Sequence, residues 1–175
     1  TAPASNGGAP ITDYIVKYTT VSANGPWYTK VDAITAKTGA VFTRLANGRT
    51  YWFAVAARNV VGYGPYTYSG PVVPYTVPDA PTAVTATAPD ANTVTAAWTA
   101  PGFDGGRPIT GYVLRYSTTG PTGPWSSTRP AASPHTLTGL PFGTYWIAVA
   151  ATNAAGTGAW AVSASPVTVH GPAVE

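Results

Sequence analysis

The sequence contains no cysteine and no methionine, and its single glutamate is Glu175. The absence of cysteine excludes disulfides, thiolate metal sites and a cysteine nucleophile. No apolar run approaches 18 residues, so we expect no membrane-spanning helix. A signal-like segment is also missing, as is a methionine at residue 1. These two absences lead us to expect a processed product or an excerpt of a longer chain.

Charged residues are scarce as well, at 9% of the chain, with a formal net charge of +3. Residues 1–76 carry six basic and two acidic groups, which gives +4, whereas residues 77–175 carry three basic and four acidic groups, which gives −1. The basic residues are scattered singly and form no stripe along the sequence. We therefore expect no nucleic-acid partner.

Residues suited to catalysis are few. The two histidines, His135 and His170, lack the spacing of a metal-ligand pair, and no Gly-x-Ser-x-Gly element occurs. Asp79, Asp90 and Asp104 lie in turn contexts, where an aspartate bonds its own backbone. We therefore predict that the chain is not an enzyme and that it has no cofactor and no metal site.

Residue types that favour turns and strands are abundant in the chain. Glycine and proline together number 37 of 175 residues, and threonine, alanine and valine are common. Glycine, proline and β-branched residues oppose helix, and they suit short strands joined by turns. Hydrophobic residues at 45%, with 21 aromatics among them, are sufficient to build a core. The composition predicts an all-β fold.

An internal repeat divides the chain. Residues 1–20 align without a gap with residues 99–118, which lie 98 positions later, and 11 of the 20 residues are identical. This period is too long for a solenoid unit and suits a small domain. We expect two domains, 1–76 and 77–175. Three prolines within residues 72–81 favour extended backbone, so we expect a short and stiff connection that arranges the domains as a rod.

Apolar residues alternate along successive short segments in both repeats. In the second repeat these segments are 83–86, 93–98, 112–116, 137–140 and 145–151, and in the first they are 14–18, 42–45 and 51–57. Such patterning predicts antiparallel sheets, each with one buried face, and thus β-sandwiches. The segments 83–86 and 93–98 have no counterpart before Thr1. We expect the first domain to lack its two opening strands and to be completed by strands from outside this chain segment.

Several short motifs recur at matching places in the two repeats. They are Pro-Ile-Thr-x-Tyr at 10–14 and 108–112, the pairs Leu45/Tyr51 and Leu140/Tyr145, Asn-x-x-Gly-x-Gly at 59–64, its counterpart at 153–158, and the Trp98 strand. Together they resemble the fibronectin type III domain. This resemblance implies tandem immunoglobulin-like sandwiches in which Tyr51 and Tyr145 form tyrosine corners. The Ala/Thr/Gly/Pro-rich composition suggests repeats of the bacterial type.

The resemblance also implies a function. Fibronectin type III repeats serve as spacers in cell-surface proteins and in secreted glycan-degrading enzymes, so we expect non-catalytic structural modules of an extracellular or cell-surface multidomain protein. Expected partners are neighbouring domains or sister subunits. No Arg-Gly-Asp tripeptide occurs, so integrin binding has no support. The alternative is an adhesive or fibre-forming module that binds protein or polysaccharide at the cell surface.

The aromatic residues are the candidates for such a contact surface. If Tyr51 and Phe53 point inward, the pleat directs Trp52 outward, and the same reasoning applies to Trp146. The pattern leaves two readings open, namely cross-strand packing beneath basic side chains or contact with a partner. Tyr66 and Tyr68, close to Tyr63 and Tyr75, either fill the joint between the domains or form the rim of a ligand site. The candidate surface comprises Trp52, Trp146, Ile15, Lys17, Arg115, Tyr66 and Tyr68.

Overall fold

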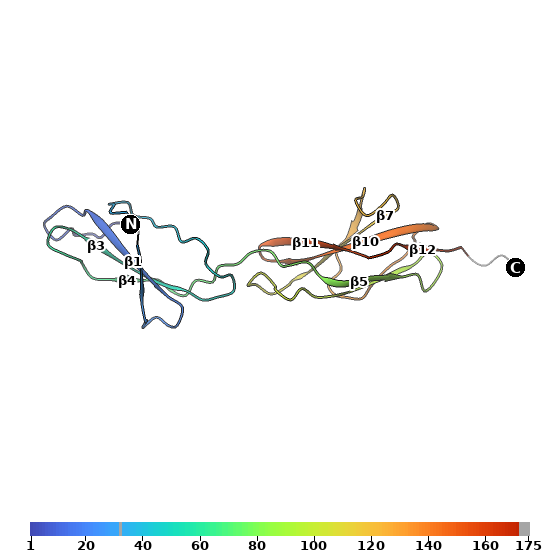
Figure 1. Cartoon of the computed structure of the whole chain (residues 1–175), viewed down its shortest axis with the longest axis horizontal. Helices are drawn as coiled ribbons and strands as arrows, with labels where there is room; N and C mark the ends of the chain where they lie inside the picture. Colours follow the sequence, from blue (N-terminus) through green and yellow to red (C-terminus); the bar gives the residue numbers. More distant parts are fainter. Residues whose placement is uncertain (32, 172–175) are drawn as a thin grey trace. The chain divides into compact units, whose positions relative to one another are not determined.

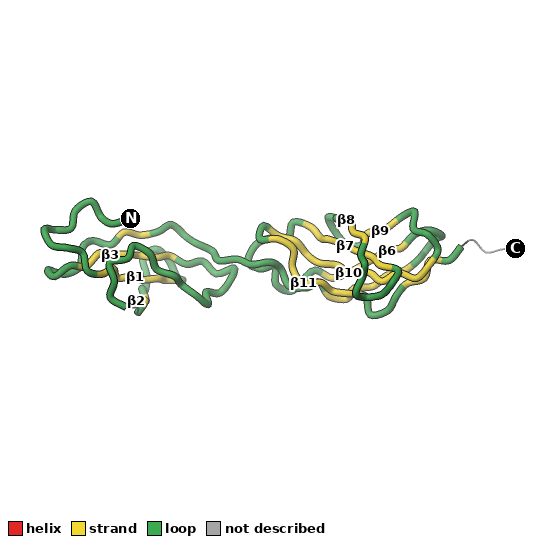
Figure 2. Tube along the Cα trace, turned by 90° about the horizontal axis from the view of Figure 1, so that it is seen from above, coloured by secondary structure: helices red, strands yellow, loops and turns green. Residues whose placement is uncertain are grey.

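The computed structural model describes residues 1–31 and 33–171, and every regular element in this part is a β-strand (Figures 1 and 2). The chain divides into two compact units, unit 1 (residues 1–74) and unit 2 (residues 75–175). This boundary lies two residues before the expected one. Residues 172–175, at the end of the expected second domain, lie outside the described part. No helix long and apolar enough to span a membrane occurs in the described ranges.

Unit 1 is built on one antiparallel sheet. Its strands, in the order β2-β1-β3-β4, are β1 (Asp13–Thr19), β2 (Tyr28–Lys30), β3 (Trp52–Arg58) and β4 (Thr67–Tyr68). Strands β1 and β3 pair along their full lengths, with Lys17 opposite Ala54. Because successive side chains alternate between faces, Tyr14, Val16 and Tyr18 share the inner face of this sheet, and Ile15 and Lys17 share its outer face.

Unit 2 has two sheets. The first has the order β5-β6-β9, and the second has the order β11-β10-β7-β8, with β12 also paired to β10. Strand β10 is the longest, and it pairs with β7, β11 and β12. The strands are β5 (Thr82–Thr87), β6 (Val94–Thr99), β7 (Gly111–Ser117), β8 (Ser126–Thr128), β9 (His135–Leu137), β10 (Gly143–Asn153), β11 (Gly156–Val162) and β12 (Val167–Val169).

The core of unit 2 lies between its two sheets. Strand β6 contributes Trp98, whose ring meets that of Tyr112 edge-on with centroids 5.1 Å apart. Leu114 from β7 and Ile147 and Val149 from β10 are fully buried against it. These are the positions that the period-two pattern places on the inner face. The alternation in the sequence therefore locates the core correctly in this unit.

Each unit contains a tyrosine whose hydroxyl bonds the backbone a few residues upstream. The Tyr145 hydroxyl donates to the carbonyl of Pro141 at 2.8 Å, and the Tyr51 hydroxyl accepts from the amide of Ala46 at 2.9 Å. Both tyrosines are buried. This is the tyrosine-corner arrangement that the resemblance implies. Burial and then the neighbouring Tyr116 raise the pKa of Tyr145.

The inner face of unit 1 has the same residue pattern but is not covered in the same way. In the described part of unit 1, all four strands lie in one sheet, and no second sheet faces it. Val55 is 38% exposed and Phe53 is half-buried. Phe42, at the position of Leu137 in β9, lies outside any strand. A hollow of about 400 Å³ lies over this face.

Candidate functional site

The outer face of unit 2 contains a cation held between two indoles. The guanidinium carbon of Arg115 lies 3.7 Å from the ring centroid of Trp160 and 4.6 Å from that of Trp125. Its Nε atom is buried and has no hydrogen-bond partner among the described residues. The contacts are therefore made with the ring faces, an arrangement stabilised by the ring quadrupole. Burial lowers the pKa of Arg115.

The strand register explains why Arg115 stacks on these indoles. Arg115 lies opposite Ala148 in β10, and Trp160 in β11 lies opposite Ala150. Alanine side chains are short, so the two large groups can meet across β10. Both alanines are fully buried, although they lie on the outer face. The small residues in β10 are thus part of the arrangement.

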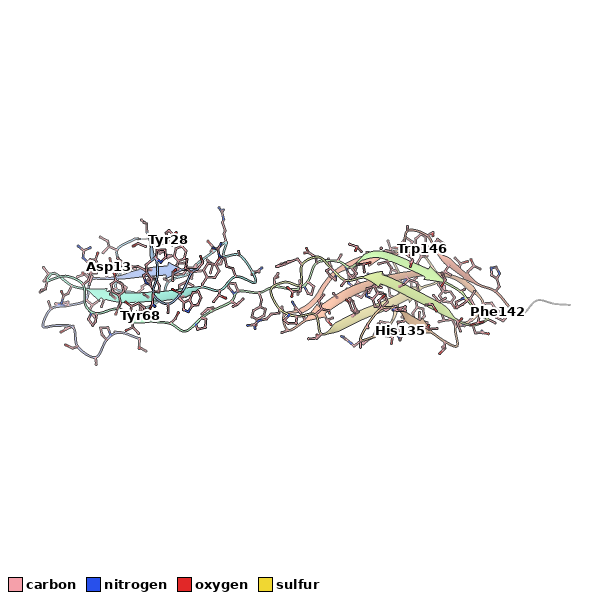
Figure 3. All side chains as sticks on the ribbon, turned by 90° about the horizontal axis from the view of Figure 1, so that it is seen from below. Asp13, Tyr28, Tyr68, His135, Phe142 and Trp146 are labelled. Carbon is pink, nitrogen blue, oxygen red and sulfur yellow. The ribbon has the colours of Figure 1, made fainter. Side chains whose placement is uncertain are left out.

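Unit 1 has a related cluster, which we call the outer aromatic cluster and define as Lys17, Trp27, Tyr66 and Tyr68. The Lys17 ammonium lies 4.7 Å from the ring centroid of Tyr66. The ring of Tyr68 is 6.4 Å from that of Tyr66 and 5.6 Å from that of Trp27. Ala54, between Lys17 and Tyr68 in the register, is buried. Tyr68, labelled in Figure 3, remains 57% exposed.

In the described residues, the cation contacts of Lys17 and Arg115 are made with rings other than those of Trp52 and Trp146. The register places both indoles on the outer face, Trp52 opposite Thr19 and Trp146 opposite Ser117. Both are half-buried, and neither has a ring or cation contact with another described residue; Trp146 is labelled in Figure 3. Lys17 and Arg115 lie two residues before Thr19 and Ser117 in their strands, and they contact other aromatic rings.

The remaining predicted contact residues separate into two groups. Ile15 lies on the outer face of β1, opposite Ala56, and is half-buried. Tyr66 and Tyr68 contact each other within unit 1, with their ring centroids 6.4 Å apart. Tyr63 instead meets Arg58 at 5.3 Å in unit 1.

The sequence motif Gly-Pro-Trp suggests that Trp27 and Trp125 close the edge of each sandwich, and neither they nor Trp160 were among the candidate contact residues. Trp27 and Trp125 each follow a Gly-Pro pair, and Trp160 lies in β11 at the position that Tyr66 occupies in unit 1. A Cβ on Gly123 would lie 2.3 Å from the Trp125 ring, and one on Gly25 would lie 2.6 Å from the Trp27 ring. The repeated Gly-Pro-Trp was therefore the available signal, because the glycine makes room for the indole.

The arrangement of these side chains offers surface for non-covalent contact. Within residues 1–31 and 33–171, no group of three or more His, Asp or Glu residues could hold a metal ion. His135 lies in β9, and the Asp104 carboxylate accepts from the amide of Gly106 at 2.8 Å within its own turn. Aromatic rings and long basic side chains instead provide flat, partly apolar surface on the outer faces.

Two strand-built units, each with a tyrosine corner, define this chain as a pair of immunoglobulin-like modules. Residues 1–73 and 79–167 match the family model of the fibronectin type III domain, so the chain belongs to the fibronectin type III family. Modules of this family are typically non-catalytic. The chain consists of two such domains in tandem.

Individual proteins are similar to this chain in sequence or in fold. The chain is 31% identical over 175 residues to human protein sidekick-1. This match covers 95% of the chain but only 8% of sidekick-1. It is similar in fold to the crystal structure of titin domains A168-A170, with a TM-score of 0.56 and 20% identity, covering 90% of this chain and 55% of that one. The chicken CNTN1 FN1-FN3 structure gives a TM-score of 0.47 and 18% identity, covering 94% and 58%.

These relatives correct one expectation from composition. Sidekick-1 is human, so the bacterial type suggested by the Ala/Thr/Gly/Pro-rich sequence is not supported. A composition rich in small and turn-forming residues reflects short strands and many turns, which this fold requires wherever it occurs. The composition of this chain therefore indicates its fold and does not indicate its source organism.

Proposed function

We propose that the chain is a non-catalytic spacer: two fibronectin type III modules that hold other parts of an extracellular or cell-surface multidomain protein at a set distance. The observation that carries the proposal is the chain path at the unit boundary. The carbonyl of Pro74 accepts from the amide of Gly48 at 2.8 Å in unit 1, and the amide of Thr76 donates to the carbonyl of Gly105 at 2.8 Å in unit 2. Only Tyr75 lies between these two bonded residues. A connection this short limits the reach of any flexible segment.

The spacer function is tested by a distance measurement. Because the chain has no cysteine, spin labels can be attached uniquely at Ala23→Cys and Ala131→Cys, two exposed loop positions in different units. We expect a narrow distribution of label-to-label distances by pulsed electron resonance. Insertion of a flexible Gly-Ser stretch after Pro74 is the matched control and should broaden it. A native distribution as broad as that of the insertion variant would contradict the proposal.

The exposure of the outer aromatic cluster favours a second candidate, adhesion to another copy of the chain. Tyrosine and tryptophan are enriched at the centres of protein interfaces. Arg115 is enclosed by two indoles in unit 2, whereas Tyr68 in unit 1 is 57% exposed and available to a partner. Sedimentation of the full chain over rising concentration should show association that Tyr68→Ala reduces. Association that is absent, or unchanged by the substitution, argues against this candidate.

Trp52, Trp146 and Ile15 belong to the same proposed contact surface on weaker grounds. They share the outer faces, but the described residues provide no ring or cation contact that would fix the two indoles in place. The double substitution Trp52→Ala and Trp146→Ala should therefore weaken association less than Tyr68→Ala does. Equal losses would extend the contact surface to these indoles.

A further inference from the structure

Unit 1 has a second hollow, to which no residue of the outer aromatic cluster contributes. It has a volume of about 620 Å³ and is lined by residues of β1 and β2 together with residues of the segment 41–51. Three of the six basic residues of unit 1 line it, namely Lys30, Arg44 and Arg49. No carboxylate is among its lining residues in the described part of the chain. We call this feature the basic hollow.

The two arginines of the basic hollow have most of their hydrogen-bond donors available. A terminal guanidinium nitrogen of Arg49 donates to the hydroxyl of Thr20 at 2.8 Å, and Thr20 also lines the hollow. The side chain of Arg44 has no hydrogen bond, ion pair or ring contact with another described residue. Both arginines are exposed. Because a guanidinium has five N–H donors, this pair can bind more than one anionic group.

The backbone of Arg44 has a conformation that suits glycine. Its φ is 60°, in the left-handed region that most side chains disfavour. The matched residue of unit 2 is Gly139, with a φ of 69°. The turn thus has the same backbone in both units, and unit 1 has a long cationic side chain where glycine would be less strained. Strained positions of this kind cluster at binding sites, so the arginine indicates a function of its side chain.

Unit 2 lacks the charges of the basic hollow. Thr128 stands at the position of Lys30, and Gly139 stands at that of Arg44. Residues 141–144, just before the tyrosine corner, contain no basic residue, whereas residues 46–50 of unit 1 contain Arg49. Both units nevertheless form the tyrosine corner that follows. The fold therefore does not require these charges.

The basic hollow lies between two segments whose counterparts in unit 2 are edge strands. Strand β8 is the last strand in the order β11-β10-β7-β8, and β9 is the last in the order β5-β6-β9. Their counterparts in unit 1 are β2 and residues 40–42, and both contribute lining residues. In unit 2, β5 and β6 follow on the other side of β9. The hollow thus uses an edge that those two strands do not cover.

Apolar side chains lie beside the charges of the basic hollow. Val41 is 79% exposed and Tyr28, labelled in Figure 3, is 55% exposed, and both line the hollow. The ring of Tyr28 lies 5.7 Å from that of Tyr18, and the Lys30 ammonium lies 5.7 Å from the ring centroid of Phe42. A ligand with apolar side chains next to its anionic groups would remove this apolar surface from water.

We infer that the basic hollow of unit 1 binds an extended acidic segment of a partner protein. Its carboxylates bind to Arg44 and Arg49, because paired N–H donors of arginine match the geometry of a carboxylate. Successive side chains of an extended segment point in opposite directions, so apolar residues that alternate with the acidic ones lie on Tyr28 and Val41. This binding function goes beyond that of a spacer.

The charge of unit 1 favours the same partner. Residues 1–74 carry six basic and two acidic groups, which gives +4. A positive surface steers an acidic segment toward it and disfavours a basic one. The exposed aliphatic side chain of Val41 favours a peptide over a polyanion without apolar side chains.

The test titrates a synthetic peptide, in which valine and aspartate alternate four times, into the full chain. At up to about 1 mM peptide we expect NMR shifts at the amides of Thr20, Tyr28 and Val41. Binding should weaken as salt is added, because salt screens the charges. The same peptide with asparagine in place of aspartate should not bind.

Three substitutions locate the binding. Arg44→Gly and Arg49→Gln should each weaken peptide binding by about tenfold, since each removes charge-assisted hydrogen bonds. Arg44→Gly places the residue of unit 2 at a left-handed position, so the urea midpoint of unit 1 should be unchanged or higher. Arg58→Gln is the matched control, because it removes the same charge and Arg58 contacts Tyr63 outside the basic hollow. It should change binding by about twofold or less.

The remaining outcomes overturn the inference. Equal weakening by all three substitutions would indicate attraction by net charge alone. Absence of binding by the aspartate peptide would exclude the acidic segment. Binding of dextran sulfate, but not of the peptide, that depends on Arg44 and Arg49 would identify a polysaccharide as the partner. A broad label-to-label distribution in the free chain would count against the spacer function alone.

Discussion

The two units place similar residues at matching positions and bury them to different extents. Val149 in unit 2 is fully buried, whereas Val55, its counterpart in unit 1, is 38% exposed. Leu114 is likewise fully buried, and Val16 is half-buried. In unit 2 a three-stranded sheet faces these positions, and the described part of unit 1 contains no such sheet. Strand pairing is thus the same in both, but burial depends on what faces the sheet.

This difference separates two contributions to stability. Pairing of β1 with β3 and of β7 with β10 follows one register, set by alternation along each strand. Burial of the inner face adds a hydrophobic contribution of roughly 25 cal/mol per Å² of apolar area. Unit 1 has the full contribution from the pairing of these two strands but only part of the contribution from burial of the inner face. Four experiments, monitored separately in each unit through the methyl signals of Ile15 and Ile147, examine this contrast.

The largest effect is expected from Trp98→Ala, which removes the indole from the core of unit 2. Large-to-small substitution of a buried aromatic residue costs about 3–5 kcal/mol. The urea midpoint of unit 2, followed at Ile147, should therefore fall strongly. The urea midpoint of unit 1, followed at Ile15, should not change. Such a result would show that unit 2 without this indole, like unit 1, obtains only part of the stability that burial of its inner face provides. A loss of less than about 1 kcal/mol would show that β6 contributes little to the stability of unit 2.

The second experiment compares Gly158→Ala with Gly64→Ala. A methyl group on Gly158 would collide with the carbonyl oxygen of Pro78, while one on Gly64 has room. We expect a loss of about 1–3 kcal/mol in unit 2 and a change within about 0.5 kcal/mol in unit 1. Urea midpoints at the two methyl probes measure both. Equal losses in the two units would contradict the greater room around Gly64.

The third experiment makes the same substitution at two matched positions, Val149→Ala and Val55→Ala. Removing two methyl groups from a fully buried site costs about 2 kcal/mol, and removing them from a partly exposed one costs about 0.5 kcal/mol or less. The difference between the two urea midpoints reports how much of the inner face of unit 1 is in water. A loss at Val55 that equals the loss at Val149 would contradict the open face.

The smallest effect is expected from pH. Because burial raises the pKa of Tyr145, folding favours its protonated form. The resulting stabilisation is complete below the ordinary tyrosine pKa of about 10 and is lost as the pH rises through the raised value of the folded state. Unit 2 should therefore become less stable to urea above about pH 10, and Tyr145→Phe should remove part of that dependence. An identical pH profile in Tyr145→Phe would exclude this residue as its source.

The fold was largely predictable because its signals are local. Alternation along 112–116 and 145–151 set which residues face inward, and the repeat at 1–20 and 99–118 transferred that assignment to unit 1. Tyr51 and Tyr145 followed from the family resemblance. These features depend on neighbouring residues in the chain or on a recurring motif, and both can be read without coordinates.

The contact surface was less predictable because it depends on which side chains meet across strands. The outward direction of Trp52 and Trp146 follows from alternation, but the pairing of Arg115 with Trp160 requires the register of three strands and the small size of the alanines between them. The hydrogen bond between Asn153 and Thr76 was missed for a similar reason. These two residues are 77 positions apart, and nothing in either local sequence indicates the bond.

The bonds of Asn153 also determine how unit 2 carries mechanical load. A pull on the polypeptide from the side of Pro74 meets the first backbone hydrogen bonds of unit 2 at Thr76, which is held by the side chain of Asn153 and the carbonyl of Gly105. The amide of Asp79, bonded to the carbonyl of Phe103 at 3.1 Å, is next along the chain. Tension is therefore passed to the loop before β7 and to the end of β10 before it reaches β5. The side chain of Asn153 thus anchors unit 2 at the residue that first bears the load.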